Sequence, residues 1–344
     1  MKAVLFHQHG GPEVLEYADF LTPEPKPGEA LIRLRAAALN RMDVMVRNGW
    51  AGLKLELPHI NGADGAGVVQ EIRGVENREL ETGDSVVINA NLGCGQCEFC
   101  LAGKDNLCLN WHLLGETVRG TYAEFVCVPI KQLHKLPKDF DFHHAAASAL
   151  VYQTAWHSLV ARGKIQGGET VLVVGAGGGV NTASIQIAKY LGARVIVVGS
   201  NSKKLEMAES IGADVLIDRS KEEDWSKAVY LATNKRGVDA VVDNVGTTLM
   251  LSLRALRKGG RLLTVGNSGS PKFEIDNRYM FAKHLSILGS TMSTIAEFNE
   301  VMDLIVAGKL KPVMDKTFPL KDAALAQERL WKHENFGKIT LDIP

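Results

Sequence analysis

The chain has 344 residues, of which 46% are hydrophobic and 23% charged, and its formal net charge is zero. This length accommodates two domains with separate cores, and the charge balance argues against nucleic acid or an anionic membrane as a partner. The apolar run from Ala3 to Phe6 is too short for a signal peptide, and no run reaches transmembrane length. We therefore expect a cytoplasmic protein that acts on a small molecule.

The first 150 residues favour a partly closed, all-β barrel. Short apolar stretches are separated by turn residues such as Pro27-Gly28 and Gly83-Asp84, which is typical of strands joined by tight turns. The expected strands are 3–6, 29–36, 67–72, 85–88 and 121–128. An alanine-rich stretch over 143–160 then predicts a helix that leads into the next domain.

From Val171 onward, strand and helix patterns alternate, which predicts a doubly wound parallel sheet of six strands, an α/β fold. The expected strands are 171–174, 194–198, 214–217, 238–242, 261–265 and 285–289. The expected helices are 181–191, 202–211, 222–233, 247–257 and 276–284. The remaining tail holds helices over 295–308 and 322–332 and a last strand over 338–343. Because this tail is too small for its own domain, we expect it to return to the first one.

The stretch from 171 to 200 predicts a nucleotide site. A buried strand, a glycine turn and an amphipathic helix form a βαβ unit, in which a dinucleotide pyrophosphate sits on the helix N-terminus. Its candidate contacts are Gly177, Gly178, Gly179 and Val180. Asn181 stands where the third glycine of a G-x-G-x-x-G turn is expected. Either the helix stands slightly off the sheet there, or the Asn181 amide caps a nearby backbone group.

The end of the second strand of this unit indicates which nicotinamide cofactor binds. NAD-binding domains place an acid there, whereas this chain has Ser200, Lys203 and Lys204, with Arg219 after the third strand. We expect these residues to hold the 2′-phosphate of NADPH, so that NADP is preferred over NAD. The alternative is that the lysines are merely solvated surface residues.

Four cysteines predict a structural zinc site. Cys94, Cys97, Cys100 and Cys108 have the spacing C-x2-C-x2-C-x7-C, which suits a closed tetrahedral shell with no open position for substrate. We expect one structural Zn²⁺. Four thiols without metal are the alternative, and the long last gap disfavours an iron–sulfur cluster. Cys127 fits a buried position in a strand.

The whole chain resembles the medium-chain dehydrogenase/reductase superfamily, in which zinc-type alcohol dehydrogenases and NADPH quinone oxidoreductases are found. The resemblance is carried by the cysteine lobe, about residues 91–110, and by eight motifs: LNRMDVMVRNG (39–49), GADGAGVV (62–69), YQTAWHSL (152–159), VLVVGAGGGVNTASIQIAKYLGA (171–193), VDAVVDNVG (238–246), GGRLLTVG (259–266), ILGSTM (287–292) and FGKITL (336–341). It implies a GroES-like catalytic domain, 1–151 with 293–344, and a Rossmann nucleotide-binding domain, 152–292.

The resemblance also implies that the catalytic zinc of the alcohol dehydrogenases is missing. Its three ligand positions correspond to Asn40, Ala63 and Leu150, and the proton-relay hydroxyl would be at Met42. None of the three is a good zinc ligand. The first two substitutions look like the quinone oxidoreductase branch, although that branch usually lacks the cysteine lobe.

We therefore expect hydride transfer from NADPH to a quinone or an enone. Asn40 is the expected hydrogen-bond donor and Asp43 the residue that organises its loop, unless the two simply cap a helix that starts at residue 41. Tyr152 and Thr154 would orient the nicotinamide, unless they face the core. The resemblance implies further cofactor contacts at Asn244, Val245, Gly266, Ser290, Thr291 and Lys338.

Two other functions stay open. A NAD(P)-dependent, zinc-family alcohol dehydrogenase is supported by the chain-wide resemblance, and a protein that binds NADPH without turnover is not excluded by any residue. The apolar strand 285–289 would lie at the sheet edge, where a second copy can pair. The resemblance implies a homodimer or homotetramer.

Overall fold

The computed structural model describes residues 1–74 and 80–344. It divides into two compact units, Met1–Gln153 with Ser293–Pro344, and Thr154–Met292. The family resemblance implies a first boundary between residues 151 and 152 instead. The difference falls inside one helix, α3 (Phe142–Trp156), which runs through the boundary without a break.

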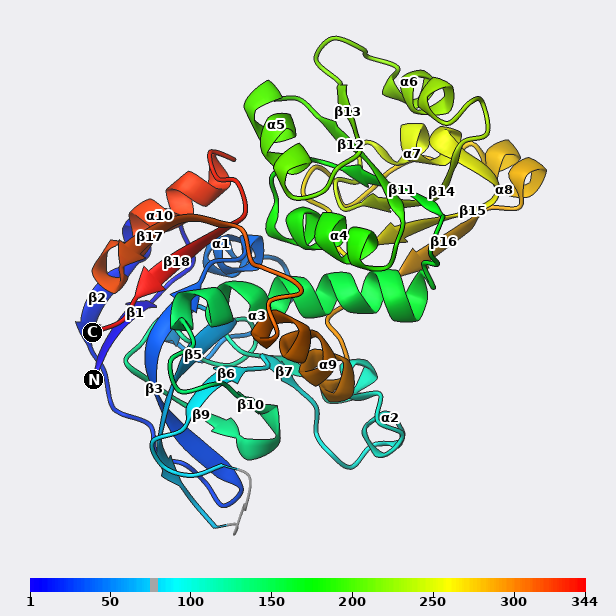
Figure 1. Cartoon of the computed structure of the whole chain (residues 1–344). Coiled ribbons are helices and arrows are strands. Elements are labelled where there is room, and N and C mark those ends of the chain that lie inside the picture. The colour runs from blue at the N-terminus through cyan, green and yellow to red at the C-terminus, as the bar shows by residue number, and fades with distance from the viewer. Residues whose placement is uncertain (75–79) are drawn as a thin grey trace. The chain divides into compact units, whose positions relative to one another are not determined.

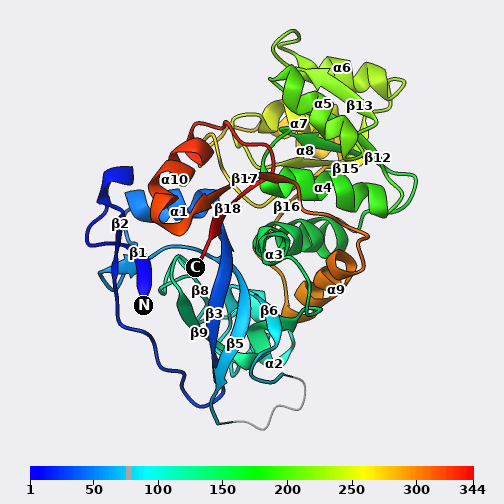
Figure 2. The same ribbon diagram turned by 60° about the vertical axis from the view of Figure 1, so that its left-hand side comes forward.

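The first unit is built on a seven-stranded, mainly antiparallel sheet that is made from both ends of the chain (Figure 1). The last strand, β18, lies beside β3 in Figure 2. The two strands are paired, with Thr340 opposite Ala38. The C-terminal tail therefore returns to the first unit, as expected for a GroES-like fold. The strands are β3 (Glu29–Ala38), β5 (Asp64–Ile72), β6 (Ser85–Ile88), β9 (Phe125–Pro129), β10 (Leu133–Lys135), β17 (Met314–Pro319) and β18 (Lys338–Asp342).

Smaller elements complete this unit. Two further sheets hold β1 (Lys2–Phe6), β2 (Glu16–Asp19) and β4 (His59–Ile60), and β7 (Asn91–Leu92) with β8 (His112–Leu113). The helices are η1 (Pro12–Val14), α1 (Arg41–Asn48), α2 (Glu98–Leu101), η2 (Asp105–Leu107), η3 (Ile130–Gln132), α9 (Ile295–Val306), η5 (Leu320–Asp322) and α10 (Ala323–Trp331). Most of these pieces are too short to produce a hydrophobic period, so the sequence did not predict them.

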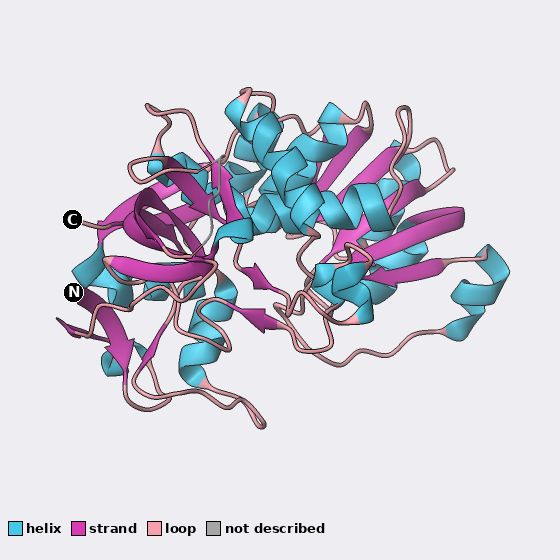
Figure 3. Cartoon of the chain, turned by 90° about the horizontal axis from the view of Figure 1, so that it is seen from below, coloured by secondary structure: helices cyan, strands magenta, loops and turns pink. Residues whose placement is uncertain are grey.

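The second unit is a parallel six-stranded sheet with helices packed against it (Figure 3). Its strand order is β13-β12-β11-β14-β15-β16, the doubly wound order of a Rossmann fold. The strands are β11 (Thr170–Val174), β12 (Arg194–Gly199), β13 (Val215–Asp218), β14 (Val238–Asp243), β15 (Leu256–Thr264) and β16 (Ser286–Gly289). The helices are η4 (His157–Arg162), α4 (Gly179–Tyr190), α5 (Ser202–Ser210), α6 (Trp225–Ala232), α7 (Leu249–Ala255) and α8 (Asn277–Lys283).

The core of the second unit explains why its strands were predictable. Every residue of β11 and of β14 is buried, because a parallel strand covered on both faces carries an unbroken apolar run. Trp225, Leu253 and Val229 of the covering helices pack against these strands in one apolar cluster. The edge position expected for the strand 285–289 is confirmed, since β16 pairs with β15 alone among the described strands.

Three sequence-based boundaries differ from the structure by four or five residues. The expected helix over 143–160 is α-helical only to Trp156, and a π-helical turn, η4, follows it. The expected strand over 121–128 starts at Phe125, because the backbone of Thr121 and Tyr122 instead bonds Gly62 and Asn61. The fifth parallel strand starts at Leu256 rather than 261, because an irregularity in β14 lets Val238 pair with Leu256.

In the described part of the chain, no helix combines the length and apolar character needed to cross a bilayer.

Candidate functional site

The first part of the candidate site is the start of α1, where the expected pair Asn40 and Asp43 lies. Asn40 is the residue before the helix, and its backbone N–H donates to Asp43 Oδ2 at 2.7 Å. The hydroxyl of Tyr122 donates to the same oxygen at 2.8 Å. Asp43 therefore caps the helix from its third position, as the capping alternative expected, and at the same time anchors Tyr122.

Asp43 is completely buried, and burial raises the pKa of its carboxyl to about 7. Burial, together with the neighbouring Asp43, also raises the pKa of Tyr122 well above its ordinary value. Asp43 Oδ1 has no hydrogen-bond partner among the described residues. Asp43 therefore lies where its charged form is poorly solvated.

The side chain of Asn40 is held by two charged groups. Its Nδ2 donates to Asp64 Oδ2 at 2.9 Å, and its Oδ1 accepts from Lys338 Nζ at 2.7 Å. Asn40 is 7% exposed, Lys338 4% and Asp64 0%, so all three groups are shielded from water. The amide nitrogen has two hydrogens, and Asp64 takes one of them.

Lys338 belongs to this cluster. Its ammonium donates to Leu39 O at 2.6 Å, to Asn40 Oδ1 at 2.7 Å and to Asp64 Oδ2 at 2.8 Å, which uses all three of its hydrogens. We therefore reassign Lys338 from the expected cofactor contacts to the Asn40 site. Neither Asp64 nor Tyr122 is among the sequence-predicted site residues, although Asp64 lies in the quoted GADGAGVV motif.

The cluster also holds α3. Asp64 Oδ1 accepts from the backbone N–H of Leu150 at 2.7 Å, so the two oxygens of one carboxylate join β5, β18 and α3. The expected Tyr152 is 1% exposed, and its hydroxyl donates to Lys311 O at 2.7 Å. Tyr152 thus serves the core of the first unit. Thr154, the first residue of the second unit, is 5% exposed.

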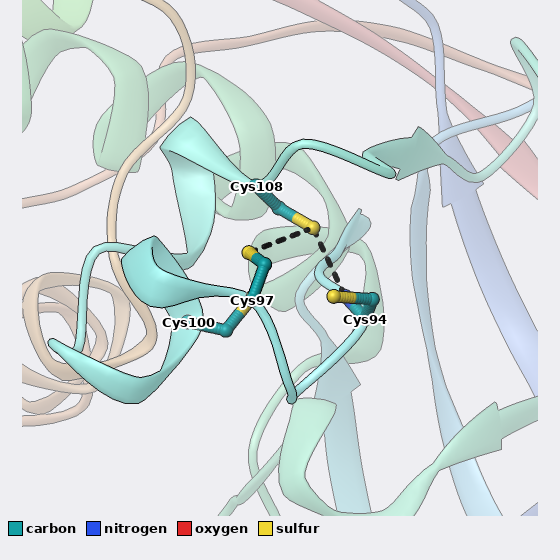
Figure 4. A group of neighbouring side chains, drawn as sticks. All are labelled: Cys94, Cys97, Cys100 and Cys108. Carbon is teal, nitrogen blue, oxygen red and sulfur yellow. Dashed lines mark hydrogen bonds between the residues drawn. The ribbon is translucent and has the colours of Figure 1, made fainter.

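The second part of the site is the cysteine cluster (Figure 4). The four sulfur atoms of Cys94, Cys97, Cys100 and Cys108 all lie within 4.8 Å of one another. Cys97 Sγ and Cys108 Sγ are 3.8 Å apart, which equals the edge of about 3.8 Å of a tetrahedron with Zn–S bonds of about 2.3 Å. The donor set fits zinc, and no thiol in it forms a disulfide.

Backbone N–H groups prepare the cluster for a metal. Those of Cys94 and Asn110 donate to Cys108 Sγ at 3.2 and 3.3 Å. Hydrogen bonds from the backbone of Cys100 and Leu109 lower the pKa of the Cys97 thiol to about 6. Such bonds favour the thiolate form of Cys97, which binds zinc, whereas burial raises the pKa of the Cys100 thiol. Cys127, half-buried in β9, lies outside the cluster.

The lobe that carries these cysteines is tied to the start of α9. Asp105 Oδ1 accepts from the N–H of Ile295 at 3.1 Å, and Asp105 Oδ2 accepts from Asn91 Nδ2 at 2.7 Å. Asn91 also donates to Ser293 O at 3.3 Å. A metal that orders the lobe therefore also orders the chain where it re-enters the first unit.

The third part of the site is the glycine turn between β11 and α4. Asn181 Nδ2 donates to Val174 O at 3.0 Å and to Gly175 O at 2.9 Å. This confirms the second alternative for Asn181, a cap on nearby backbone. Gly175 has φ +104°, and a Cβ there would lie 2.5 Å from Asn181 Nδ2, so only glycine fits. Gly177 and Gly178 precede α4, and Val180 is its second residue. The helix starts at Gly179, two residues before the predicted start at 181.

The expected phosphate contacts follow the ends of β12 and β13, which are neighbouring strands. The backbone N–H of Arg219 donates to Gly199 O at 2.8 Å, so Arg219 follows β13 beside the turn that holds Ser200. Asn201 caps α5 by accepting from the N–H of Lys204 at 3.1 Å. Ser200, Lys203 and Arg219 are exposed. The nearby Asp218 carboxylate is occupied by Ser220 and Lys221.

Two buried polar atoms in the second unit have no partner among the described residues, and both belong to expected cofactor contacts. They are Asn244 Nδ2 and Ser290 Oγ. The other side of the Asn244 amide is used, because Oδ1 accepts from Val265 N at 2.8 Å. Buried polar groups without partners are costly in a folded protein, so these atoms fit a bound polar ligand. The expected Val245, Gly266 and Thr291 lie in the same unit.

The chain matches two family models, the alcohol dehydrogenase GroES-like domain over residues 26–138 and the zinc-binding dehydrogenase over residues 179–307. An NAD-dependent alcohol dehydrogenase of Sulfurisphaera tokodaii is 33% identical over 98% of each chain. The human quinone oxidoreductase is 30% identical, covering 96% of this chain and 94% of its own. A crystal structure of an NAD-dependent alcohol dehydrogenase is 43% identical, covers all of both chains and superposes with a TM-score of 0.96.

The chain belongs to the medium-chain dehydrogenase/reductase superfamily. The relatives named above are dehydrogenases and an oxidoreductase of this superfamily. This medium-chain dehydrogenase/reductase is therefore an oxidoreductase. The superfamily and the cysteine cluster together support NAD(P) binding and a structural zinc. The relatives include both alcohol dehydrogenases and quinone oxidoreductases, so their names leave the substrate class open.

The positions that correspond to the catalytic zinc ligands of this superfamily do not fit a metal. Ala63 and Leu150 have aliphatic side chains, which cannot bind a metal. The carboxamide oxygen of Asn40 is the one possible ligand atom of the three, and it is a weak one. That atom, Asn40 Oδ1, already accepts from an ammonium. Among the described residues, the cysteine cluster is the single group of three or more His, Cys, Asp or Glu side chains that could hold a metal ion.

Replacing Cys97 with serine is expected to abolish zinc binding, because a hydroxyl is a poor substitute for a thiolate. Zinc per chain should fall from about one to near zero, and limited proteolysis should cut within 94–110, since the metal orders this lobe. Cys127→Ser is the matched control and should keep its zinc. Equal zinc content in the two variants would contradict the site.

Replacing Asp43 with asparagine is expected to change how stability depends on pH. Because burial raises the folded pKa to about 7, above about 3.9 in the unfolded chain, the wild type loses stability as pH rises from about 4 to about 7. The variant does not titrate there. Its unfolding free energy relative to the wild type should therefore increase by roughly 1–3 kcal/mol from pH 5 to pH 8.

Urea unfolding at several pH values measures this difference. Asp19→Asn serves as a control, because the Asp19 side chain is 82% exposed. A difference between Asp43→Asn and wild type that stays constant over the range would mean that Asp43 keeps an ordinary pKa in the fold.

Proposed function

We propose that this oxidoreductase transfers a hydride from NADPH to an acceptor with a conjugated carbonyl, a quinone or an enone, without a catalytic zinc. The observation that carries the proposal is the Asn40 site, where the Asn40 amide and the Asp64 carboxylate hold a lysine ammonium. Without a Lewis acid, an unactivated alcohol or ketone is a difficult substrate. An acceptor that delocalises the developing negative charge over its own π-system needs less stabilisation from the protein.

The residues of the first unit supply orientation and one hydrogen bond. When bound, NADPH supplies a hydride that adds to the conjugated system, while the electron pair moves to the carbonyl oxygen and solvent supplies a proton. The second hydrogen of Asn40 Nδ2 donates to that oxygen and stabilises the negative charge that develops on it. Asp43 holds the loop by accepting the backbone N–H of Asn40.

The second unit would hold the cofactor. The unpartnered Asn244 Nδ2 and Ser290 Oγ are suited to polar groups of the nicotinamide half, and the glycine turn fixed by Asn181 to the pyrophosphate. Ser200, Lys203, Lys204 and Arg219 favour NADPH, because they put cations and a hydroxyl at the end of β12 and no acid. Asp218, which directly precedes Arg219, is already paired with Lys221.

An NAD-dependent alcohol dehydrogenase is the second candidate. It is favoured by the names of the 33% and 43% identical relatives. It requires a route to polarise the alcohol oxygen that the Asn40 site does not offer. A protein that only binds NADPH is a third candidate, which the assay below separates from the first.

Assembly and compartment are part of the proposal. The unpaired edge of β16 supports pairing with a second copy, and hence a homodimer or homotetramer, which a monomer in light scattering would contradict. None of the five cysteines forms a disulfide, which supports a reducing compartment, the cytoplasm.

Purified protein with one zinc per chain is expected to oxidise NADPH in the presence of quinones or enones. Absorbance at the NADPH band measures this, and product analysis checks that the acceptor gains two electrons. Simple primary and secondary alcohols with NAD or NADP are the comparison substrates. Faster oxidation of alcohols than reduction of enones would favour the second candidate, and quenching of NADPH fluorescence without consumption would favour the third.

Lys204→Ala is expected to raise the KM for NADPH by about tenfold to a hundredfold, because it removes a charge-assisted contact to the 2′-phosphate. The KM for NADH should change less than twofold. Lys227→Ala, an exposed lysine on α6, is the matched control. Equal effects of Lys204→Ala on the two cofactors would place the 2′-phosphate elsewhere.

A further inference from the structure

The amide of an asparagine can point either way, because turning it by 180° exchanges its oxygen and its nitrogen. Its neighbours decide which orientation is stable. Around Asn40 the neighbours leave no choice. The ammonium of Lys338 can only donate hydrogen bonds. The carboxylate of Asp64, when ionised, can only accept them.

The observed distances match one orientation. Asn40 Oδ1 lies 2.7 Å from Lys338 Nζ, and Asn40 Nδ2 lies 2.9 Å from Asp64 Oδ2. In the reversed amide, an oxygen would face the carboxylate and an NH₂ group would face the ammonium. Both contacts would be repulsive, and burial of all three groups prevents water from screening them.

Lys338 and Asp64 keep their places by bonds that do not involve Asn40. They pair with each other at 2.8 Å. Lys338 also donates to Leu39 O, and Asp64 accepts from the N–H of Leu150 through its other carboxylate oxygen. The backbone oxygen of Asp64 accepts from Thr121 Oγ1 at 2.7 Å. The ion pair is therefore a fixed frame, and the Asn40 amide is the part that it orients.

We infer that Lys338 and Asp64 are positioning residues for the reaction, which act by fixing the Asn40 amide so that Nδ2 keeps one hydrogen for the acceptor's carbonyl oxygen. The inference rests on the proposed function, in which Asn40 is the donor. Neither charged group touches the acceptor. Lys338 has no hydrogen left to give, and Asp64 offers no donor.

The kinetic test compares variants that keep or lose the frame. Lys338→Arg keeps a buried cation and is expected to retain kcat within about threefold. Lys338→Met, and the charge-neutral double variant Asp64→Asn with Lys338→Met, are expected to lower kcat with an enone or quinone by about tenfold to a hundredfold. The dissociation constant of NADPH should change less than twofold in all of them, because the cofactor contacts lie in the second unit.

Arg329→Met is the matched control. It removes an ion pair with Asp315 in the same unit, at 2.7 Å, that does not contact Asn40. Any general loosening of the unit should appear in this variant as a lower melting temperature with kcat unchanged. If the double variant keeps wild-type kcat, or if Lys338→Arg loses as much as Lys338→Met, the inference is overturned and the proposed function stands.

A second readout does not need turnover. In protein labelled with ¹⁵N-asparagine, the Asn40 side-chain signals are those missing from Asn40→Ala. In the wild type, their hydrogens should exchange slowly with solvent, and in the double variant the signals should shift and exchange at least tenfold faster. Unchanged signals would overturn the inference. Failure of the wild type to reduce any quinone or enone would instead overturn the proposed function, and this readout would still decide the amide orientation.

Discussion

One buried ammonium organises the first unit of this protein. Lys338 Nζ donates to three oxygens that come from Leu39, Asn40 and Asp64, and it is almost completely shielded from water. A buried charge is costly unless it is paired and fully hydrogen-bonded, and here both conditions are met. Because Lys338 is in the last strand and its partners are near residues 39–64, this interaction also binds the C-terminal tail to the N-terminal barrel.

The same ammonium determines what chemistry the site offers. In the superfamily's zinc enzymes, this region holds a cation that accepts electron pairs from its ligands and from the substrate. Here the cation is a hydrogen-bond donor whose three hydrogens are all used inside the protein. In the proposed reaction its influence reaches the substrate through the Asn40 amide. This is why we propose an acceptor that carries its own conjugation as the substrate, with a structural task for the cysteine cluster.

Much of the fold was predictable because the signals are local or periodic. The unbroken apolar runs of β11 and β14 and the cysteine spacing are visible in the sequence and depend on a few neighbouring residues. The return of the tail to the barrel and the edge position of β16 were also expected, the former from domain size and family resemblance. Strands of two residues, such as β4, carry no period and were missed.

The details of the candidate site depend on contacts between residues far apart in the sequence. Lys338 and Asn40 are separated by 298 positions, so no spacing rule assigns the ammonium to the amide. The resemblance put Lys338 among the cofactor contacts, whereas its hydrogen bonds assign it to the Asn40 site. The role of Asn181 was only partly predictable from the sequence. The sequence showed that a glycine was missing, and the structure showed that the amide caps Val174 and Gly175.

The Lys338 ammonium occupies the place between Asn40 and Asp64, and we expect it to keep a metal ion out. Anomalous diffraction at the zinc edge, from crystals grown with excess zinc, tests this expectation most directly. We expect one zinc peak per chain, within about 2.3 Å of the four cysteine sulfurs, and Lys338 Nζ in hydrogen-bond contact with Asp64. A second zinc peak within about 2.2 Å of the Asp64 carboxylate, with Lys338 displaced, would contradict the account.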